Sequence, residues 1–392
     1  MTGRERVLAV LNGTKPDITP VDIGAIESSG VSAAAYGSLK ASLGISGGNT
    51  RVSDPIACVV RVEKAFREKL KLDAAGLFIE PRKWRPSTLP DGSDGLVPEK
   101  WVCKDDEGAE VFRHAVAELE CRRDRGKCAF RYVGQPLAEC TSVAEVAKKL
   151  QAIAFFDWPY HADEIAAEFG ARARSKRQET SAALVLNVRT RVAGGAWVLR
   201  GEERILADVE SAPAVADAIL ERLANATVAR LTDVLPDVAV HADAVCISEG
   251  PCPGLTLEAY RSRIRPHHER ILSYIRSTTA KPIVAVVRGL SIEVIRDMLE
   301  LGIDAVAPML SPGTPTVTEL REGCGPDVPL WGAGIDPKAL LARKPKDVRK
   351  TVKKALEAIG GNCIFAFGNL VLPETSGDNV RAALEAARKF RP

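Results

Sequence analysis

Long hydrophobic runs are missing from this chain of 392 residues. No stretch reaches the roughly 18 apolar residues that a membrane-spanning helix needs, so the sequence argues against an integral membrane protein. The first residues, MTGRERVLAVLNG, carry charges and lack the apolar core of a signal peptide. We therefore expect a cytoplasmic protein.

An excess of one charge is missing as well. Lys and Arg number 54 and Asp and Glu number 51, which leaves a formal net charge of +3. Proteins that bind nucleic acid carry a clear basic surplus, so this balance argues against such a partner. The apolar fraction of 46% is that of an ordinary globular protein.

Several common site motifs are also absent. The nine cysteines never occur as C-x-x-C, and neither H-x-C nor H-E-x-x-H is present. Because zinc sites use such spacings, the sequence predicts no metal site. There is no P-loop and no G-x-G-x-x-G, which argues against the nucleotide sites built on those motifs. Without an export signal, the cysteines are expected to be reduced thiols.

Short apolar runs, each followed by a helical pattern, recur along the chain. They are rich in Val, Ile and Leu and lack strict alternation, as expected for parallel strands that are buried on both faces. There are eight of them, at 20–26, 74–79, 182–188, 243–247, 282–287, 304–309, 329–334 and 363–368. Eight such strands predict an α/β fold of the (β/α)8 TIM-barrel type, a single domain over residues 1–392.

The region of about 81–181 departs from this alternation and is predicted to be an insertion after the second strand. KWVCKDDEGAEVFRH (100–114) predicts a hairpin that turns at 105–108, and helices are expected near 141–152 and 158–172. An insertion after a barrel strand lies on the catalytic side, so it either covers the site or elaborates the fold. The basic stretch RARSKR (172–177) is expected to be a solvated face.

Charged and polar residues end the predicted strands, where barrel enzymes place their chemistry. Arginines there can hold carboxylates in a fork, and a glutamate among apolar strands can act as a general acid. Asp336 precedes a proline and a helix, which also fits a helix N-cap, and Glu27 also fits a solvated side chain. The strand-end residues are Glu27, Glu80, Arg189, Arg191, Glu249, Arg288, Met309, Asp336 and Asn369.

Five segments, taken in order, resemble the uroporphyrinogen decarboxylase superfamily from residue 4 to about 390. They are GRERVLAVLNGTKPDITPVD (3–22), GGAWVLRGEERILADV (194–209), ADAVCISEGPCPGLTLEAYRSRIRPHHERI (242–271), WGAGIDPKALL (331–341) and IFAFGNLVLPETSGDNV (364–380). The resemblance implies a TIM barrel with one of two chemistries. Decarboxylases of the superfamily remove acetate carboxylates from a porphyrinogen without a cofactor. Its methyltransferases move methyl groups between a corrinoid protein and a thiol or methoxy compound, often through zinc.

The resemblance separates these branches residue by residue. Where the zinc-dependent thiol methyltransferases have their ligands, this chain has Val286, Arg288 and Asn369, which disfavours that branch. Arg288 keeps the cation that the decarboxylases have there, Glu80 replaces their aspartate, and Trp197 replaces their active-site tyrosine. Their arginine-rich segment after the first strand is absent, which removes the main charge match to a porphyrinogen with many carboxylates.

Three hypotheses follow. The first is a metal-free decarboxylase or lyase acting on an anionic small molecule. In this hypothesis the substrate carboxylate is held by Arg189, Arg191 and Arg288. The proton comes from Glu80 or Glu249. Trp197, Asn369 and Asp336 complete the expected substrate site.

The second hypothesis is the demethylating component of a methyltransferase, which passes the methyl group to a corrinoid protein. No cofactor is expected for the first hypothesis, whereas the second needs a corrinoid on a partner protein. The third is a ligand-binding barrel without catalysis, and a homodimer is left open.

Overall fold

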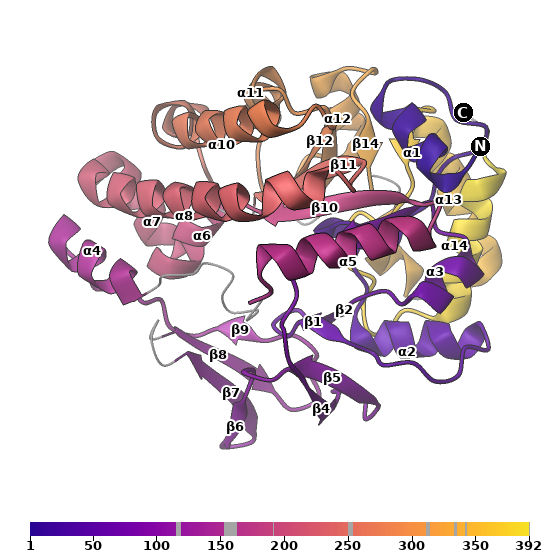
Figure 1. Ribbon diagram of the computed structural model, residues 1–392, viewed down its shortest axis with the longest axis horizontal. Helices are drawn as coiled ribbons and strands as arrows, with labels where there is room; N and C mark the ends of the chain where they lie inside the picture. The colour runs from indigo at the N-terminus through magenta and orange to yellow at the C-terminus, as the bar shows by residue number, and fades with distance from the viewer. Residues whose placement is uncertain are drawn as a thin grey trace.

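The structure is a computed structural model, and it describes residues 1–114, 119–152, 163–190, 192–249, 254–310, 314–332, 335–341 and 343–391. Its centre is a parallel sheet in which each strand pairs with the next along the chain (Figure 1). The strands are β3 (Ala74–Leu77), β10 (Ala183–Arg189), β11 (Ala244–Glu249), β12 (Ile283–Val287), β13 (Ala305–Pro308), β14 (Leu330–Trp331) and β15 (Cys363–Ile364). These seven strands are seven of the eight apolar runs, which confirms the reading of continuous apolar segments as parallel strands.

The first apolar run occupies the eighth place in the barrel. Val21 bridges Phe365 in parallel, and the Phe365 amide donates to the Pro20 carbonyl at 2.8 Å. On the other side, the Asp73 amide donates to the Val21 carbonyl at 2.9 Å, beside the start of β3. The run forms no regular strand because Gly24, at φ +79°, turns the chain into a short 3-10 helix, η1 (Glu27–Ser29). The predicted TIM-barrel fold is confirmed.

Alternate strand residues fill the barrel lumen. Small and branched side chains such as Ala183, Val185 and Val286 form a buried cluster there. Trp331 is fully buried among them, and its indole N–H donates to Asp22 at 3.0 Å. Helix α1 (Gly3–Leu11) contributes apolar residues to the same cluster, so it covers the amino-terminal end of the lumen. The lumen is a packed core, and polar chemistry is left to its other end.

The other face of each strand packs against helices, as expected for a sheet wound by right-handed crossovers. Figure 1 shows these helices around the strands. They are α5 (Ala166–Glu179), α6 (Val192–Arg200), α7 (Glu202–Ser211), α8 (Pro213–Ala239), α9 (Leu257–Ala259), η2 (Tyr260–Ile264), α10 (Arg265–Thr278), α11 (Ile292–Glu300), α12 (Val317–Cys324), η3 (Pro337–Leu340), α13 (Pro345–Ile359) and α14 (Gly377–Lys389). The long connection between the first run and β3 holds α2 (Ala33–Ser42), β1 (Val52–Asp54), β2 (Val59–Val60) and α3 (Lys64–Leu70).

The region after β3 is mostly antiparallel β-structure. It contains β4 (Trp84–Thr88), β5 (Asp94–Pro98), β6 (Cys103–Asp106), β7 (Ala109–His114), β8 (Leu119–Asp124) and β9 (Arg131–Tyr132), then α4 (Val143–Ala152). The hairpin predicted at 100–114 is confirmed as β6 and β7, with positive φ at Glu107 and Gly108 in the turn. The helix predicted near 141–152 is confirmed as α4. The first part of the helix predicted near 158–172 lies outside the described residues, and α5 begins at Ala166.

Helix α5 belongs to the barrel although it falls inside the predicted insertion of about 81–181. Lys176 on this helix donates to the Gly76 carbonyl of β3 at 2.7 Å. Arg172 donates to the Phe78 carbonyl at 2.6 Å. The expectation of a solvated face at 172–177 is therefore wrong for these two residues, because the basic side chains cap the open backbone of β3. The added β-structure ends before α5.

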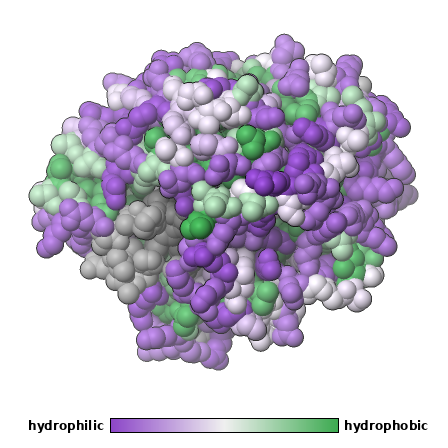
Figure 2. All heavy atoms as spheres, viewed as in Figure 1, coloured by the Kyte–Doolittle hydropathy of each residue, from purple (hydrophilic) through white to green (hydrophobic). Residues whose placement is uncertain are grey.

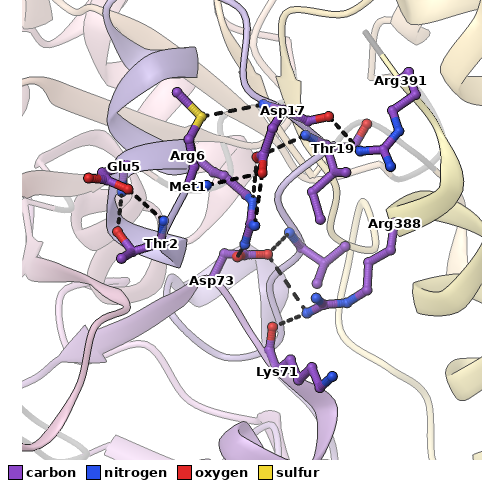
Figure 3. A network of polar contacts seen from close by, with 12 residues as sticks. Met1, Thr2, Glu5, Arg6, Asp17, Thr19, Lys71, Asp73, Arg388 and Arg391 are labelled. Carbon is purple, nitrogen blue, oxygen red and sulfur yellow. Dashed lines mark hydrogen bonds and ion pairs between the residues drawn. The ribbon is translucent and has the colours of Figure 1, made fainter.

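A buried carboxylate ties the amino-terminal end of the barrel together (Figure 3). Asp73 is 2% exposed, and it accepts hydrogen bonds from the Val21 amide at 2.9 Å and from Arg6 at 3.0 Å. Arg388 of the last helix lies 3.8 Å from the same carboxylate. One side chain thus connects the first run, the first helix and the last helix, which brings the two ends of the chain to one place.

The surface drawn in Figure 2 is mostly hydrophilic, with hydrophobic residues scattered singly or in small groups. In the part of the chain that the structure describes, no helix is long and apolar enough to cross a membrane.

Candidate active site at the carboxyl end of the barrel

Arg189, Glu27 and Ser248 meet where the lumen opens at the carboxyl ends of the strands. Ala183 and Val185 of β10 face the lumen, and the two-residue alternation of a strand places Arg189 on the same side. Arg189 Nε donates to Glu27 Oε1 at 2.5 Å, and the Ser248 hydroxyl donates to the other oxygen of that carboxylate. Glu27 is therefore held in place, which corrects the reading of it as a solvated side chain.

Arg288 lies on the same rim, after the end of β12. The lumen-facing residues Val284 and Val286 precede it in steps of two. Its side chain is exposed, and among the described residues it makes no hydrogen bond or ion pair. Met309, which follows β13, packs against the lumen cluster close by in the fold. The rim thus combines an available guanidinium with an apolar floor, which suits an anion with a hydrophobic body.

Glu80 follows β3 and is surrounded by arginines. An oxygen of the Glu80 carboxylate lies 3.8 Å from each of three arginine nitrogens, Nη1 of Arg51, Nε of Arg61 and Nη1 of Arg172. These separations are longer than hydrogen bonds. Within the described ranges the Glu80 side chain accepts no hydrogen bond, and it is 17% exposed. These long ion pairs leave its oxygens able to take part in a hydrogen bond with a ligand.

Arg61 lies beside Glu80 and also interacts electrostatically with Glu27. Its guanidinium stacks over the Phe78 ring, 3.7 Å from the ring centroid. Burial lowers the pKa of Arg61 to about 9, an effect that Glu80 and Glu27 oppose and Arg189 strengthens. Its Nε atom is buried and has no hydrogen-bond partner in the described structure. The positive charge of Arg61 is therefore only partly balanced by the carboxylates at the mouth of the barrel.

Glu249 lies elsewhere, although it directly follows the lumen-facing Ser248. Its oxygens accept the amide hydrogens of Val192 at 3.0 Å and Gly194 at 2.9 Å, at the start of α6. His268 Nε2 lies 2.8 Å from Oε2, and the side chain is 1% exposed. These contacts give Glu249 a capping role at a helix amino terminus. Its predicted role as proton donor finds no support in this position.

Trp197 also lies away from the rim. Its indole lines a small apolar cavity between α6, α7 and α8, with Ile205 and Leu220. The indole N–H is buried and has no hydrogen-bond partner among the described residues. The predicted contact of Trp197 with substrate stays a prediction.

Asp336 and Asn369 make local contacts. Asp336 is exposed, and its Oδ1 accepts the Lys338 amide at 2.9 Å, so it caps η3 as its alternative reading expected. Asn369 donates to the Leu310 carbonyl at 3.0 Å, which ties the chain after β15 to the chain after β13. Arg191 lies outside the described residues. The substrate contacts predicted for these three residues stay predictions.

The positions that hold zinc in the related thiol methyltransferases do not fit the metal here. Val286 is buried in the lumen, Arg288 is a cation, and the Asn369 amide is engaged by backbone groups. Zinc sites in proteins use thiolate, imidazole or carboxylate ligands, which these residues cannot supply. Over the described ranges no group of three or more His, Cys, Asp or Glu side chains could hold a metal ion. We therefore derive no step through zinc.

The cations beside Glu80 were missed in the sequence. No sequence motif marks Arg61 as a site residue. The stretch that contains Arg172 and Lys176 was expected to be solvated. A signal for the last two exists on α5, where Phe169 and Ala173 are buried. Positions 172 and 176 continue that stripe at helical spacing, so a basic pair there is turned toward the barrel.

The sequence profile of the uroporphyrinogen decarboxylase (URO-D) family matches residues 194–390, half of the chain, which includes strands β11 to β15. The chain belongs to the URO-D family. Among characterised members, it is 30% identical over 183 residues to a uroporphyrinogen decarboxylase of Saccharopolyspora erythraea, which is 45% of this chain and 49% of that protein. It is 30% identical over 184 residues to one of Methylococcus capsulatus, 46% of this chain and 50% of that protein. The match thus spans about half the length of these relatives.

The fold likeness extends further than the sequence likeness. A methyltransferase from Methanosarcina mazei superposes with a TM-score of 0.58 at 17% sequence identity. The superposition covers 100% of this chain and 99% of that one. At this identity the likeness concerns the fold, and it places the whole URO-D family chain in one architecture.

Proposed function

We propose that this URO-D family protein is a lyase that decarboxylates a small anionic substrate at the barrel mouth without a metal. The observation that carries the proposal is the state of three carboxylates. Glu27 is held by Arg189 and Ser248, and Glu249 caps a helix, whereas Glu80 accepts no hydrogen bond among the described residues. Glu80 is the one of the three that is placed to exchange a proton with a ligand.

The cations around the mouth supply the binding half of the proposal. Arg288 is exposed and unpaired in the described structure, and Arg61 is half-buried beside an apolar ring. Guanidinium groups bind carboxylates through two parallel hydrogen bonds, and they do so more strongly where water is excluded. Arg191 is added to this set from the sequence prediction alone.

The chemistry proposed for this set is a simple proton replacement. The bond between the substrate carbon and its carboxylate carbon breaks, carbon dioxide leaves, and the electron pair stays on the substrate as a carbanion. Arg61 and Arg288 stabilise the negative charge. The Glu80 carboxylate takes a proton from solvent and passes it to the carbon, so the carboxylate is restored and no redox partner is needed.

Carbon dioxide release from a panel of small carboxylic acids tests the proposal. The panel includes mono- and dicarboxylates with an electron-accepting group next to the reacting carbon, and uroporphyrinogen itself. For a substrate that turns over, Glu80→Gln is expected to lower kcat by roughly 100-fold or more, because general acid catalysis contributes on that scale. Glu168→Gln is the matched control, since this exposed carboxylate pairs only with Arg82 in the described structure. Equal losses in both variants would refute the role of Glu80.

A methyltransferase is the second candidate. The observation in its favour is that the fold of the Methanosarcina mazei methyltransferase covers this whole chain, whereas the decarboxylase sequence matches cover half of it. In this reading Glu80 protonates the demethylated leaving group, and a corrinoid protein receives the methyl group. A methylcobalt signal with a cobalt(I) corrinoid partner and methoxy compounds, together with no carbon dioxide release, would replace the first proposal by this one. Tight anion binding with neither activity would favour a ligand-binding barrel.

A further inference from the structure

A cavity of about 340 Å³ lies beside the barrel mouth, between α3, β3 and α5. The two helices are neighbours, since Lys64 of α3 lies 3.9 Å from Glu179 of α5 (Figure 1). Gly76 of β3 lines the barrel side of the cavity. A Cβ atom there would lie 2.1 Å from the Phe78 ring and 2.7 Å from the Ala25 carbonyl oxygen, so only glycine allows this close packing.

The walls of this cavity are strongly basic. Two carboxylates, Glu63 and Glu80, face five cations, an excess of three positive charges. Two of these charges are balanced from outside the cavity, Glu63 by Lys40 at 2.9 Å and Lys64 by Glu179 at 3.9 Å, so the excess of three is unchanged. The five cations are Arg51, Arg61, Lys64, Arg67 and Lys176.

Two of these cations have only backbone partners. Lys176 Nζ donates to the Gly76 carbonyl at 2.7 Å. Arg67 Nη1 donates to the Val62 carbonyl at 3.1 Å. In the described structure neither has a carboxylate oxygen within 4.0 Å. Buried charges without counterions are costly, so proteins normally pair them or use them to bind an ion.

The pKa values of Lys176 and Arg67 also reflect this lack of counterions. Burial lowers the pKa of Lys176 to about 7, with Arg67 and Arg172 adding to the effect and Glu80 opposing it. Burial also lowers the pKa of Arg67. A bound anion would reverse both changes, because an opposite charge within a few ångströms favours the charged form of a base.

We propose that this cavity binds an oxyanion with two negative charges, either a phosphate monoester or a dicarboxylate. Guanidinium forks and an ammonium group are the donors that such anions take in proteins. Two charges on the ligand, rather than one, match an excess of three positive charges on the walls. Arg61 and Glu80 of the proposed decarboxylation also line this cavity, so the inference rests in part on that proposed function. Lys176 and Arg67 have no part in that chemistry, and they carry the new claim.

Equilibrium binding to the full chain tests the site without any turnover. Titration calorimetry with inorganic phosphate and with malonate is run at constant ionic strength set by sodium chloride, so that general screening does not change. Saturable binding of one equivalent of either anion supports the site, and the tighter of the two identifies the ligand class. Chloride-like weak binding of both anions to the wild-type protein would overturn the proposal.

Substitutions place the anion in this cavity. Lys176→Gln and Arg67→Gln are each expected to raise Kd at least about tenfold, since each removes a charge that faces the ligand. Lys354→Gln is the matched control, because this exposed lysine of α13 makes no side-chain hydrogen bond or ion pair in the described structure. Circular dichroism checks that each variant is folded. Folded variants that bind phosphate as tightly as the control would place the anion elsewhere and overturn the proposal.

A pH series adds a readout that a structural role of Lys176 would not produce. Sulfate serves as the probe because it stays doubly charged across neutral pH. The charged groups facing Lys176 are Glu80 after β3, Arg61 before α3, Arg67 within α3 and Arg172 on its own helix. Sulfate affinity is expected to fall as the pH rises above about 7, where free Lys176 loses its proton. In Lys176→Arg the fall should vanish, and an unchanged fall would contradict the proposal.

Discussion

Arg189 and Glu27 lie 162 residues apart in the chain, and their side chains form a 2.5 Å ion pair at the mouth of the barrel. The pair joins β10 to the turn after the first apolar run. Both side chains are largely buried, at 14% and 18% exposed. Such a pair is worth more than an exposed one, because water screens it less.

A double-mutant cycle with Glu27→Gln and Arg189→Gln is therefore expected to give a coupling free energy of about 1–3 kcal/mol in urea unfolding. The exposed pair Arg349–Glu385, at 3.0 Å, serves as control and should give at most about 0.5 kcal/mol. Equal coupling for both pairs would show that burial at the mouth does not strengthen the interaction.

Arg288→Gln is expected to weaken substrate binding without weakening the fold. Its side chain is exposed and unpaired in the described structure, so the free energy of unfolding should stay within about 0.5 kcal/mol of wild type. For a carboxylate substrate, KM should rise about tenfold or more, because a charged hydrogen bond is lost. Steady-state kinetics and urea titrations separate the two effects, with Arg174→Gln as control, since Arg174 is also exposed and unpaired in the described structure. A variant with unchanged KM would remove Arg288 from the substrate site.

Asp73→Asn should destabilise the whole barrel from its amino-terminal end. Asn offers one acceptor where Asp73 accepts from both Val21 and Arg6, and the neutral amide leaves Arg6 and Arg388 without their buried counterion. Breaking a buried charge pair costs about 3–5 kcal/mol, and because Arg6 keeps its ion pair with Asp17, a loss near the lower end of this range is expected in urea unfolding. The exposed Asp378→Asn, which removes a surface pair with Arg381, should cost less than about 1 kcal/mol. A small loss of stability in Asp73→Asn would mean that the polar network in Figure 3 does not stabilise the closure of the barrel.

The stability of the protein should depend on pH through Lys176. The pKa of this lysine is about 7 when folded, below the 10.5 of an unperturbed lysine, so the unfolded state binds the proton more tightly. Stability must then rise with pH above about 7 and stop rising near the unperturbed value. Urea titrations without multivalent anions should show this rise in wild type and a flatter profile in Lys176→Met. Identical profiles would mean that the cavity does not lower the pKa of Lys176.

Much of the barrel could be read from the sequence because a parallel sheet with two buried faces imposes continuous apolar runs. The run at 182–188 became β10 and the run at 282–287 became β12 for this reason. The sequence could not show that the first run forms no regular strand, because the turn at Gly24 that shortens it depends on contacts with Ser29 in η1.

The candidate site was predicted less completely, because strand-end residues sit on alternating faces. Ser248 and Glu249 are neighbours, yet one faces Glu27 in the lumen and the other caps α6. A shift of one residue in the assumed register exchanges the two sides, so a list of strand-end residues cannot say which of them meet.

The sequence by itself determined the fold class, the family and the presence of acids and arginines at the strand ends. It could do so because burial and strand order leave a local pattern along the chain. The tertiary structure alone decided that Arg61, Arg172 and Glu80 form one cluster and that Lys176 faces a basic cavity. These residues come from separate segments, and their meeting depends on which face of α5 packs against β3.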